Sequence, residues 1–163
     1  MRPELPRTIK QATVWALIAL IVFLGVQWRA HHAQRTRLQM RAAAIEIRRG
    51  ADGQYHWPGE INGRTVDFLV DTGASGTAIS TALARELHLK PLGSVSSSTA
   101  GGTVTGQLVR ADIVLRGGVT VSGLRMAALP GLGHSSLLGM DVLGRLDLQQ
   151  RDGVLRIERA PVR

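Results

Sequence analysis

An apolar run that ends in a carboxylate is the feature that most constrains this sequence. Phe68-Leu69-Val70 is followed at once by Asp71-Thr72-Gly73. A short apolar run bounded by turn residues is typical of a strand buried on both faces. A carboxylate directly after such a strand must find a hydrogen-bond partner, a ligand or a proton, because burying an unpaired charge is costly. The pattern therefore predicts either a functional carboxylate at Asp71 or a turn Asp that bonds to its own backbone.

The residues after Asp71 suit a tight loop. Gly73 allows a sharp turn, and we expect the Thr72 hydroxyl to brace the loop. We also expect Ser75 to hydrogen-bond the outer carboxylate oxygen of Asp71. Upstream, Asn62-Gly63 separates two strand-like segments, and this dipeptide favours the positive φ angles of a type I′ hairpin turn.

Short strands and turns are also predicted for the rest of the chain from Gly50 onward. Few aromatic residues (4%) and 19 glycines suit a small β-rich domain with many turns. One helix is expected over Ser80–Leu89, with Ser80 or Thr81 as its cap. The predicted strand segments are Gln54–Ile61, Arg64–Val70, Leu108–Leu115, Val119–Leu129, Leu146–Leu148 and Val154–Ile157. The last two form a hairpin with a turn at Asp152-Gly153. Ser94–Gly106 is predicted to be a small, polar hairpin or loop, and the mostly apolar run Ser136–Leu143 is expected to be buried.

Several catalytic chemistries are excluded by the sequence. The chain has no cysteine, which rules out disulfides, thiolate nucleophiles and zinc–thiolate sites. No Gly-rich stretch continues into Gly-Lys-Ser/Thr, so there is no phosphate-binding P-loop. The segment Gly133–Leu137 lacks the last Gly of a nucleophile elbow. The five histidines show no paired ligand spacing, and the adjacent His31 and His32 would not face one another on a helix.

An uncharged stretch from Gln11 to Trp28 predicts a transmembrane helix. Its length is close to the roughly 20 residues that span a bilayer core, and Trp15 and Trp28 lie near its ends, where indoles favour the headgroup level. A cleaved signal peptide is the competing interpretation, because Arg2, Arg7 and Lys10 form a basic region before it. Trp28 and Arg29 are poor residues for a small-x-small cleavage site, so we expect an uncleaved anchor.

Most of the net charge of +8 lies beside this stretch. Residues 1–49 contain nine Arg and Lys against two Glu, whereas the remainder has 11 basic and 10 acidic residues. A nucleic-acid-binding domain would carry its excess charge on the folded body, so membrane-adjacent charge is the better interpretation. Charge on the two sides of the stretch does not decide its orientation. The predicted organisation is a tail (1–10), a transmembrane helix (11–28), a juxtamembrane stalk (29–49) and a folded domain (50–163). A helix is expected in the stalk, because its residues have helical propensity and Leu38, Ala42 and Ile45 form a partial apolar stripe.

Five elements of the folded part occur in the order known from one family. They are Gly53-Gln54-Tyr55, Ile61-Asn62-Gly63, Phe68–Ser75, Thr99-Ala100-Gly101-Gly102 and Leu137-Leu138-Gly139-Met140. With them, the chain resembles the bacterial membrane-anchored aspartic proteases of the retropepsin-like clan, over Gly53–Ile157. His88 departs from the family, which usually has Gly after the short helix.

The resemblance implies an all-β fold, a retropepsin-like closed barrel corresponding to half of an acid protease, with one short helix. It implies an aspartic endopeptidase with Asp71, Thr72 and Gly73 at the catalytic position, and no cofactor or metal. The substrate-binding residues implied for flap and pocket are Ala74, Ser75, Thr99, Ala100, Gly101 and Gly102.

Asp-Thr-Gly occurs once, whereas peptide hydrolysis by carboxylates needs two of them around a water molecule. We therefore expect a homodimer acting on polypeptides, with Asp71 and its symmetry mate at the axis. The resemblance places the domain in the periplasm, held by a single-pass helix in the bacterial inner membrane. The alternative is a membrane-tethered binding module that keeps the retropepsin-like fold and cleaves nothing.

Overall fold

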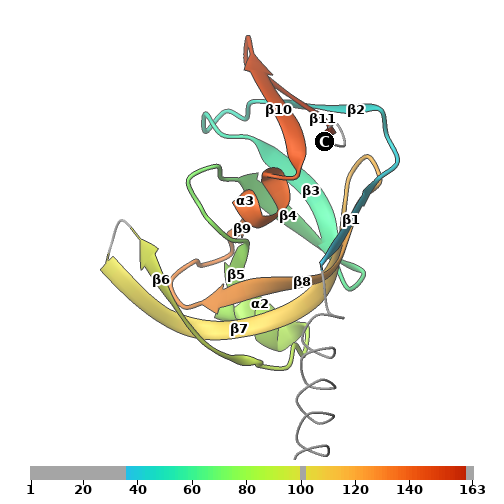
Figure 1. Ribbon diagram of the computed structural model, residues 1–163. Helices are drawn as coiled ribbons and strands as arrows, with labels where there is room; N and C mark the ends of the chain where they lie inside the picture. Colours follow the sequence, from blue (N-terminus) through green and yellow to red (C-terminus); the bar gives the residue numbers. More distant parts are fainter. Residues whose placement is uncertain (1–35, 100–101, 161–163) are drawn as a thin grey trace, which may run out of the picture. The chain divides into compact units, whose positions relative to one another are not determined.

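Six strands close into a barrel in the computed structural model, which describes residues 36–99 and 102–160 (Figure 1). The ring order is β8 (Val119–Leu129), β5 (Ala78–Ser80), β9 (Ser136–Leu138), β4 (Arg64–Val70), β3 (His56–Ile61) and β7 (Gly102–Leu115). A β7–β8 pairing closes the ring, β1 (Arg37–Met40) extends it beside β8, and β6 (Gly93–Thr99) lies at the far edge beside β7. The predicted all-β, closed-barrel fold is confirmed.

The segment predicted as a helical stalk instead supplies two strands. β1 pairs with β8, and β2 (Ala44–Arg48) joins β10 (Leu146–Arg151) and β11 (Val154–Arg159) in a three-stranded sheet. The helix prediction is therefore wrong for residues 37–48, and the compact unit begins at Thr36. Helix propensity is a weak preference that tertiary contacts override. Here Met40 and Ile47 are both buried against the domain.

Turn residues behave as their chemistry predicts. Asn62 and Gly63 have φ angles of 49° and 83°, and they connect β3 to β4 in the expected hairpin. Asp152 and Gly153, with φ angles of 50° and 75°, connect β10 to β11 in the same way.

Two short helices lie in the described part of residues 50–163, where one was predicted. α2 (Thr81–Glu86) begins where expected, since the Ser80 hydroxyl accepts a hydrogen bond from the Leu83 N–H at 3.1 Å. His88 follows α2 with a φ of 51°, the left-handed conformation that Gly adopts most easily. This explains why Gly is the usual residue of the resembled family here. α3 (Met140–Leu143) follows β9 directly.

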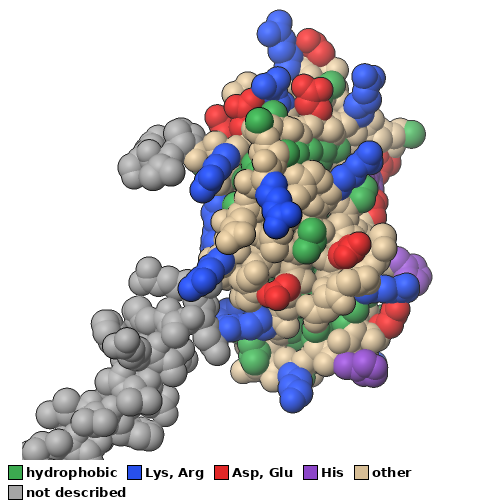
Figure 2. All heavy atoms as spheres, turned by 90° about the vertical axis from the view of Figure 1, so that its right-hand side faces the viewer, with side chains coloured by type: hydrophobic (Ala, Val, Ile, Leu, Met, Phe, Trp, Pro, Cys, Tyr) green, Lys and Arg blue, Asp and Glu red, His purple; other side chains and the backbone are tan. Residues whose placement is uncertain are grey.

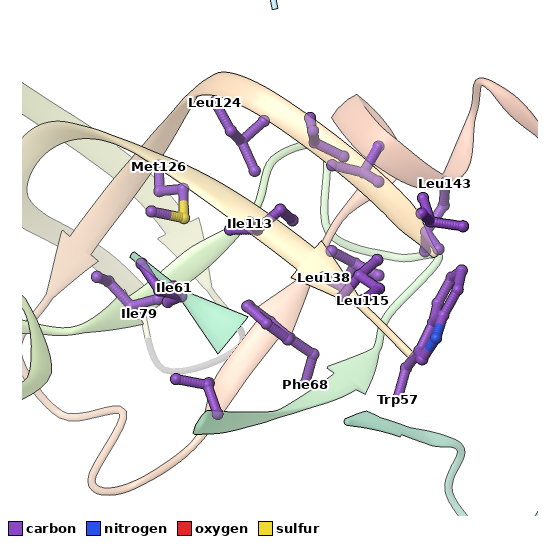
Figure 3. Close-up of a cluster of buried hydrophobic side chains, with 14 of the residues drawn as sticks. Trp57, Ile61, Phe68, Ile79, Ile113, Leu115, Leu124, Met126, Leu138 and Leu143 are labelled. Carbon is purple, nitrogen blue, oxygen red and sulfur yellow. The ribbon is translucent and has the colours of Figure 1, made fainter. Parts of the chain in front are cut away.

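The barrel interior holds a continuous apolar core. Trp57 of β3, Phe68 of β4 and Leu138 of β9 are at most 1% exposed and point inward in Figure 3. They pack with side chains of β7 and β8, including Ile113 and Met126. In the apolar run before Asp71, Phe68 is buried and Val70 packs partly against the core from the same face of β4, whereas Leu69 lies on the other face and is half-exposed. The expectation of a strand buried on both faces is thus wrong for this single copy of the chain.

The predicted tail (1–10), transmembrane helix (11–28) and first part of the stalk (29–35) lie outside the described residues. Within residues 36–99 and 102–160, no helix has the length and apolarity needed to cross a bilayer.

On the face of the domain drawn in Figure 2, Lys and Arg side chains are interspersed with Asp and Glu side chains. This mixture matches the nearly balanced charge of the chain after residue 49.

Candidate active site

Asp71 lies where two neighbouring parallel strands end. β4 and β9 run side by side, with Val70 opposite Leu138, and the Asp71 N–H donates to the Leu138 carbonyl at 3.0 Å. The chain then turns back, so that the Gly73 N–H donates to Asp71 Oδ1 at 2.9 Å and the Ala74 N–H to the Asp71 carbonyl at 3.3 Å. A Cβ at Gly73 would lie 3.2 Å from Asp71 Oδ1. Glycine at position 73 therefore lets this loop close around the carboxylate.

The segment after β9 supports the Asp71 loop from behind. The Met140 N–H, at the start of α3, donates to the Ala74 carbonyl at 2.8 Å. Gly139 is packed against the backbone of Gly76, and a Cβ at Gly139 would lie 2.5 Å from the Gly76 carbonyl oxygen. The Leu-Leu-Gly element of residues 137–139 thus packs behind the loop.

Thr77 and Asp141 form a connection that the sequence analysis missed. The buried Thr77 hydroxyl donates to Asp141 Oδ1 at 2.7 Å, and the Thr77 N–H donates to Asp141 Oδ2 at 3.0 Å. The same hydroxyl accepts from the Gly139 N–H at 3.2 Å. Thr77, and not the exposed Thr72, therefore supplies the hydroxyl that braces the loop. The available signal was a second carboxylate two residues after Gly139 in an otherwise apolar run.

Ser75 differs from its expected role. It is exposed, and within the described part of the chain the hydrogen bond to the Asp71 carboxylate comes from Gly73 and not from Ser75. Ser75 instead lines the cleft beside the loop together with Ala74.

A cleft of about 670 Å³ opens in front of Asp71. Its walls come from the Asp71 loop, from β5, from the β6–β7 hairpin and from β8. The residues that the sequence analysis did not assign to it include Val95, Ser96, Ser97, Ser98, Leu108, Arg125, Ala127, Leu129, Leu132 and Leu137. A volume of this size is typical of ligand-binding clefts.

The predicted flap is a two-stranded hairpin. β6 and β7 pair antiparallel, with Gly93 opposite Leu108 at one end of the described ladder and Thr99 opposite Gly102 at the other. Ala100 and Gly101 lie outside the described residues. Residues 95–98 of β6 line the cleft.

We expect Gly139→Ala to lower the free energy of unfolding by about 1–3 kcal/mol, because the new methyl group would collide with the Gly76 backbone. Urea unfolding of the variant and the wild type measures this difference. Gly76→Ala is a matched control, since a Cβ there would meet only Asp141 Oδ2, at 3.9 Å. Equal losses in both variants would contradict the close packing described for Gly139.

A second group of titratable side chains lies outside the cleft lining. His56 Nδ1 is 2.8 Å from Asp67 Oδ2, and His56 Nε2 is 2.8 Å from Asp52 Oδ2. The hydrogen bond with Asp52 raises the pKa of His56 above its ordinary 6.5, and the same bond lowers the pKa of Asp52 below 3.8. All three side chains are well exposed. No group of three acidic or histidine side chains within the described ranges is arranged to hold a metal ion.

We expect this cluster to make stability depend weakly on pH. The raised pKa of His56 gives stabilisation that is complete below 6.5 and is lost as pH rises through the folded-state value. The lowered pKa of Asp52 gives stabilisation that is present above 3.8 and is lost in stronger acid. His56→Gln should therefore lower Tm by about 1–3 °C near pH 5.5 and by less near pH 8.5. An equal loss at both pH values, measured by thermal unfolding, would show that the charged imidazole is not involved.

The closed barrel, the carboxylate at the end of a buried strand and the hairpin beside the cleft define the retropepsin-like class of aspartic proteases. Residues 57–145 match the family model described as "gag-polyprotein putative aspartyl protease". The chain belongs to this family, and among its members it is related to bacterial retropepsin-like proteins.

Two relatives illustrate the relationship. The crystal structure of a retropepsin-like aspartic protease from Rickettsia conorii has a TM-score of 0.59 and 26% identity, and the match covers 71% of this chain and 99% of that one. An uncharacterized protein of Rickettsia prowazekii (strain Madrid E) is 29% identical over 158 residues, 88% of this chain and 68% of the relative. The fold and family predicted from the sequence are confirmed by these matches.

Proposed function

We propose that this chain is a membrane-anchored aspartic endopeptidase that uses Asp71 carboxylates from two copies to activate a water molecule. The observation that carries the proposal is the position of Asp71, half-buried at the end of β4 and facing a cleft beside a β-hairpin. The loop that holds it donates a hydrogen bond to β9 and accepts one from α3. Such a preorganised carboxylate is suited to general acid–base chemistry.

A second copy is needed because the cleft of one chain contains one carboxylate. Asp71 is the single acidic residue among the described residues that line it. In the proposed dimer, one ionised carboxylate takes a proton from water, and the other, protonated, donates a hydrogen bond to the scissile carbonyl. Thr72 and Gly73 are exposed beside Asp71, and Met140, whose N–H bonds the same loop, is 41% exposed. We propose that the second copy covers this surface.

The proposed substrate is an extended polypeptide. β6 lies at the edge of the barrel sheet and pairs with β7 alone among the described strands, so its other edge is open to a further strand. Peptides bind such edges through main-chain hydrogen bonds, while side-chain pockets give specificity. Small residues of β6 and of the Asp71 loop leave room for this peptide in the cleft.

Membrane attachment is part of the proposal and depends on the sequence of residues 11–28. A single-pass helix there would hold the catalytic domain on the periplasmic side of the bacterial inner membrane. Confinement to a membrane raises the effective concentration of protomers, which favours a dimeric active site.

Cleavage of a denatured protein mixture by the full-length chain, in the presence and absence of pepstatin, tests the proposal. Mass spectrometry of the products should show new peptide termini that disappear when the catalytic carboxylates are blocked. Failure of the correctly folded protein to cleave any polypeptide would favour the binding module.

A further inference from the structure

Arg125 is the one cation among the described residues that line the cleft, and with Asp71 it accounts for all of their formal charge. It lies on β8, on the same face as Ala127 and Leu129, since alternate residues of a strand share a face. All three line the cleft. A peptide bound there would therefore meet apolar walls around Ala127 and a guanidinium at Arg125.

A second arginine stands beside the first. Arg110 of β7 is directly opposite Arg125 in the β7–β8 ladder, so both side chains leave the sheet on the same face. Nε and Nη2 of Arg110 are buried and have no hydrogen-bond partner in the described part of the chain. Buried donors of a charged group are normally paired. Within that same part, no Asp or Glu forms an ion pair with either arginine.

Two adjacent cations without an acidic partner would be satisfied by a carboxylate from outside the domain. Guanidinium groups bind carboxylates with well-defined geometry. The Ala127 N–H donates to the Thr77 carbonyl, which places this part of β8 beside the far end of the Asp71 loop. A side chain that reaches Arg125 would therefore belong to a substrate residue away from the scissile bond.

The spacing of the subsites follows from strand geometry. Ala127 and Arg125 are two residues apart, about 7 Å along β8, and side chains two residues apart in an extended peptide have the same separation. Leu108 of β7 is opposite Ala127 and also lines the cleft, so the subsite at Ala127 is apolar.

We propose that Arg125, with Arg110 beside it, selects substrates that carry Asp or Glu at one position. This acidic residue lies two residues from an apolar substrate residue, on the side of that residue away from the scissile bond. This specificity rests on the proposed protease function. It identifies the substrate class as extended polypeptides with an acidic residue at that position.

The test uses the full-length chain and a library of short randomised peptides. Products identified by mass spectrometry and aligned on the cleaved bond should show Asp and Glu favoured over Asn and Gln by about fivefold at the Arg125 position. Arg125→Gln should remove the preference, and Arg125→Glu should replace it with a preference for Lys and Arg. Arg116→Gln is the matched control, because Arg116 lines other hollows of the surface. An unchanged acidic preference in Arg125→Gln, or none in the wild type, would overturn the proposal.

A binding measurement separates this inference from the proposed function. Peptides captured from the same library by immobilised Asp71→Asn protein should be enriched in Asp and Glu, and the enrichment should vanish in the Asp71→Asn/Arg125→Gln double variant. Enrichment without cleavage by the wild type would refute the protease function and support the acidic subsite. Capture without acidic enrichment, or no capture at all, would contradict the subsite.

Discussion

Replacing Asp71 with Asn is expected to abolish peptide-bond cleavage, with kcat/KM reduced by at least about 10³-fold, because an amide cannot take a proton from water. Residual cleavage is measured with the peptides that the wild type hydrolyses fastest. The fold should survive, since Asp71 Oδ1 accepts one hydrogen bond from the Gly73 N–H, and an amide oxygen can accept the same bond. Far-UV circular dichroism and Tm should therefore stay close to those of the wild type.

Asp147→Asn is a matched control for this change. Asp147 is an exposed residue of β10, outside the cleft lining, and its substitution removes the same charge. It should leave kcat/KM unchanged. Retained proteolysis in Asp71→Asn would refute the assignment of Asp71, and an equal loss in Asp147→Asn would attribute the effect to net charge.

Deleting residues 1–49 is expected to destabilise the domain severely, whereas deleting residues 1–35 should leave its stability nearly unchanged. The longer deletion removes β1 and β2 and exposes the surfaces that Met40 and Ile47 cover. Burial of two such side chains contributes about 3–6 kcal/mol, a large part of the roughly 5–15 kcal/mol that holds a domain folded. The remaining β11 would also lose its pairing with β2.

Urea unfolding of the two truncated proteins measures the difference. The protein that begins at Thr36 serves as the control, because it lacks the same proposed anchor and keeps both strands. Equal unfolding midpoints would contradict the assignment of residues 37–48 to the fold.

Local chemistry explains which parts of the fold were predictable. The Asn62-Gly63 and Asp152-Gly153 turns need positive φ angles, and few residue pairs adopt them easily. Ser80 likewise caps α2 with its own side chain. These features depend on neighbours in the sequence, so the sequence alone predicted them.

Long-range pairing explains what was missed. β1 and β2 pair with β8 and β11, strands whose positions are not evident from residues 37–48 themselves. The cleft wall at Arg125 and the Thr77–Asp141 connection also join segments far apart in the chain. Asp71, Ala74 and Ser75 were assigned to the site because one motif contains them. The walls from β6 and β8 required the barrel to be known.

The central claim, that one chain supplies half of an active site, is tested most directly by mixing wild-type and Asp71→Asn proteins in equal amounts at constant total concentration. If protomers exchange and pair at random, about one quarter of the dimers contain two Asp71 residues, so activity should fall to about one quarter of that of the pure wild type. Activity of about one half in a mixture whose protomers have exchanged would show that each chain cleaves peptides alone, and would contradict the paired site.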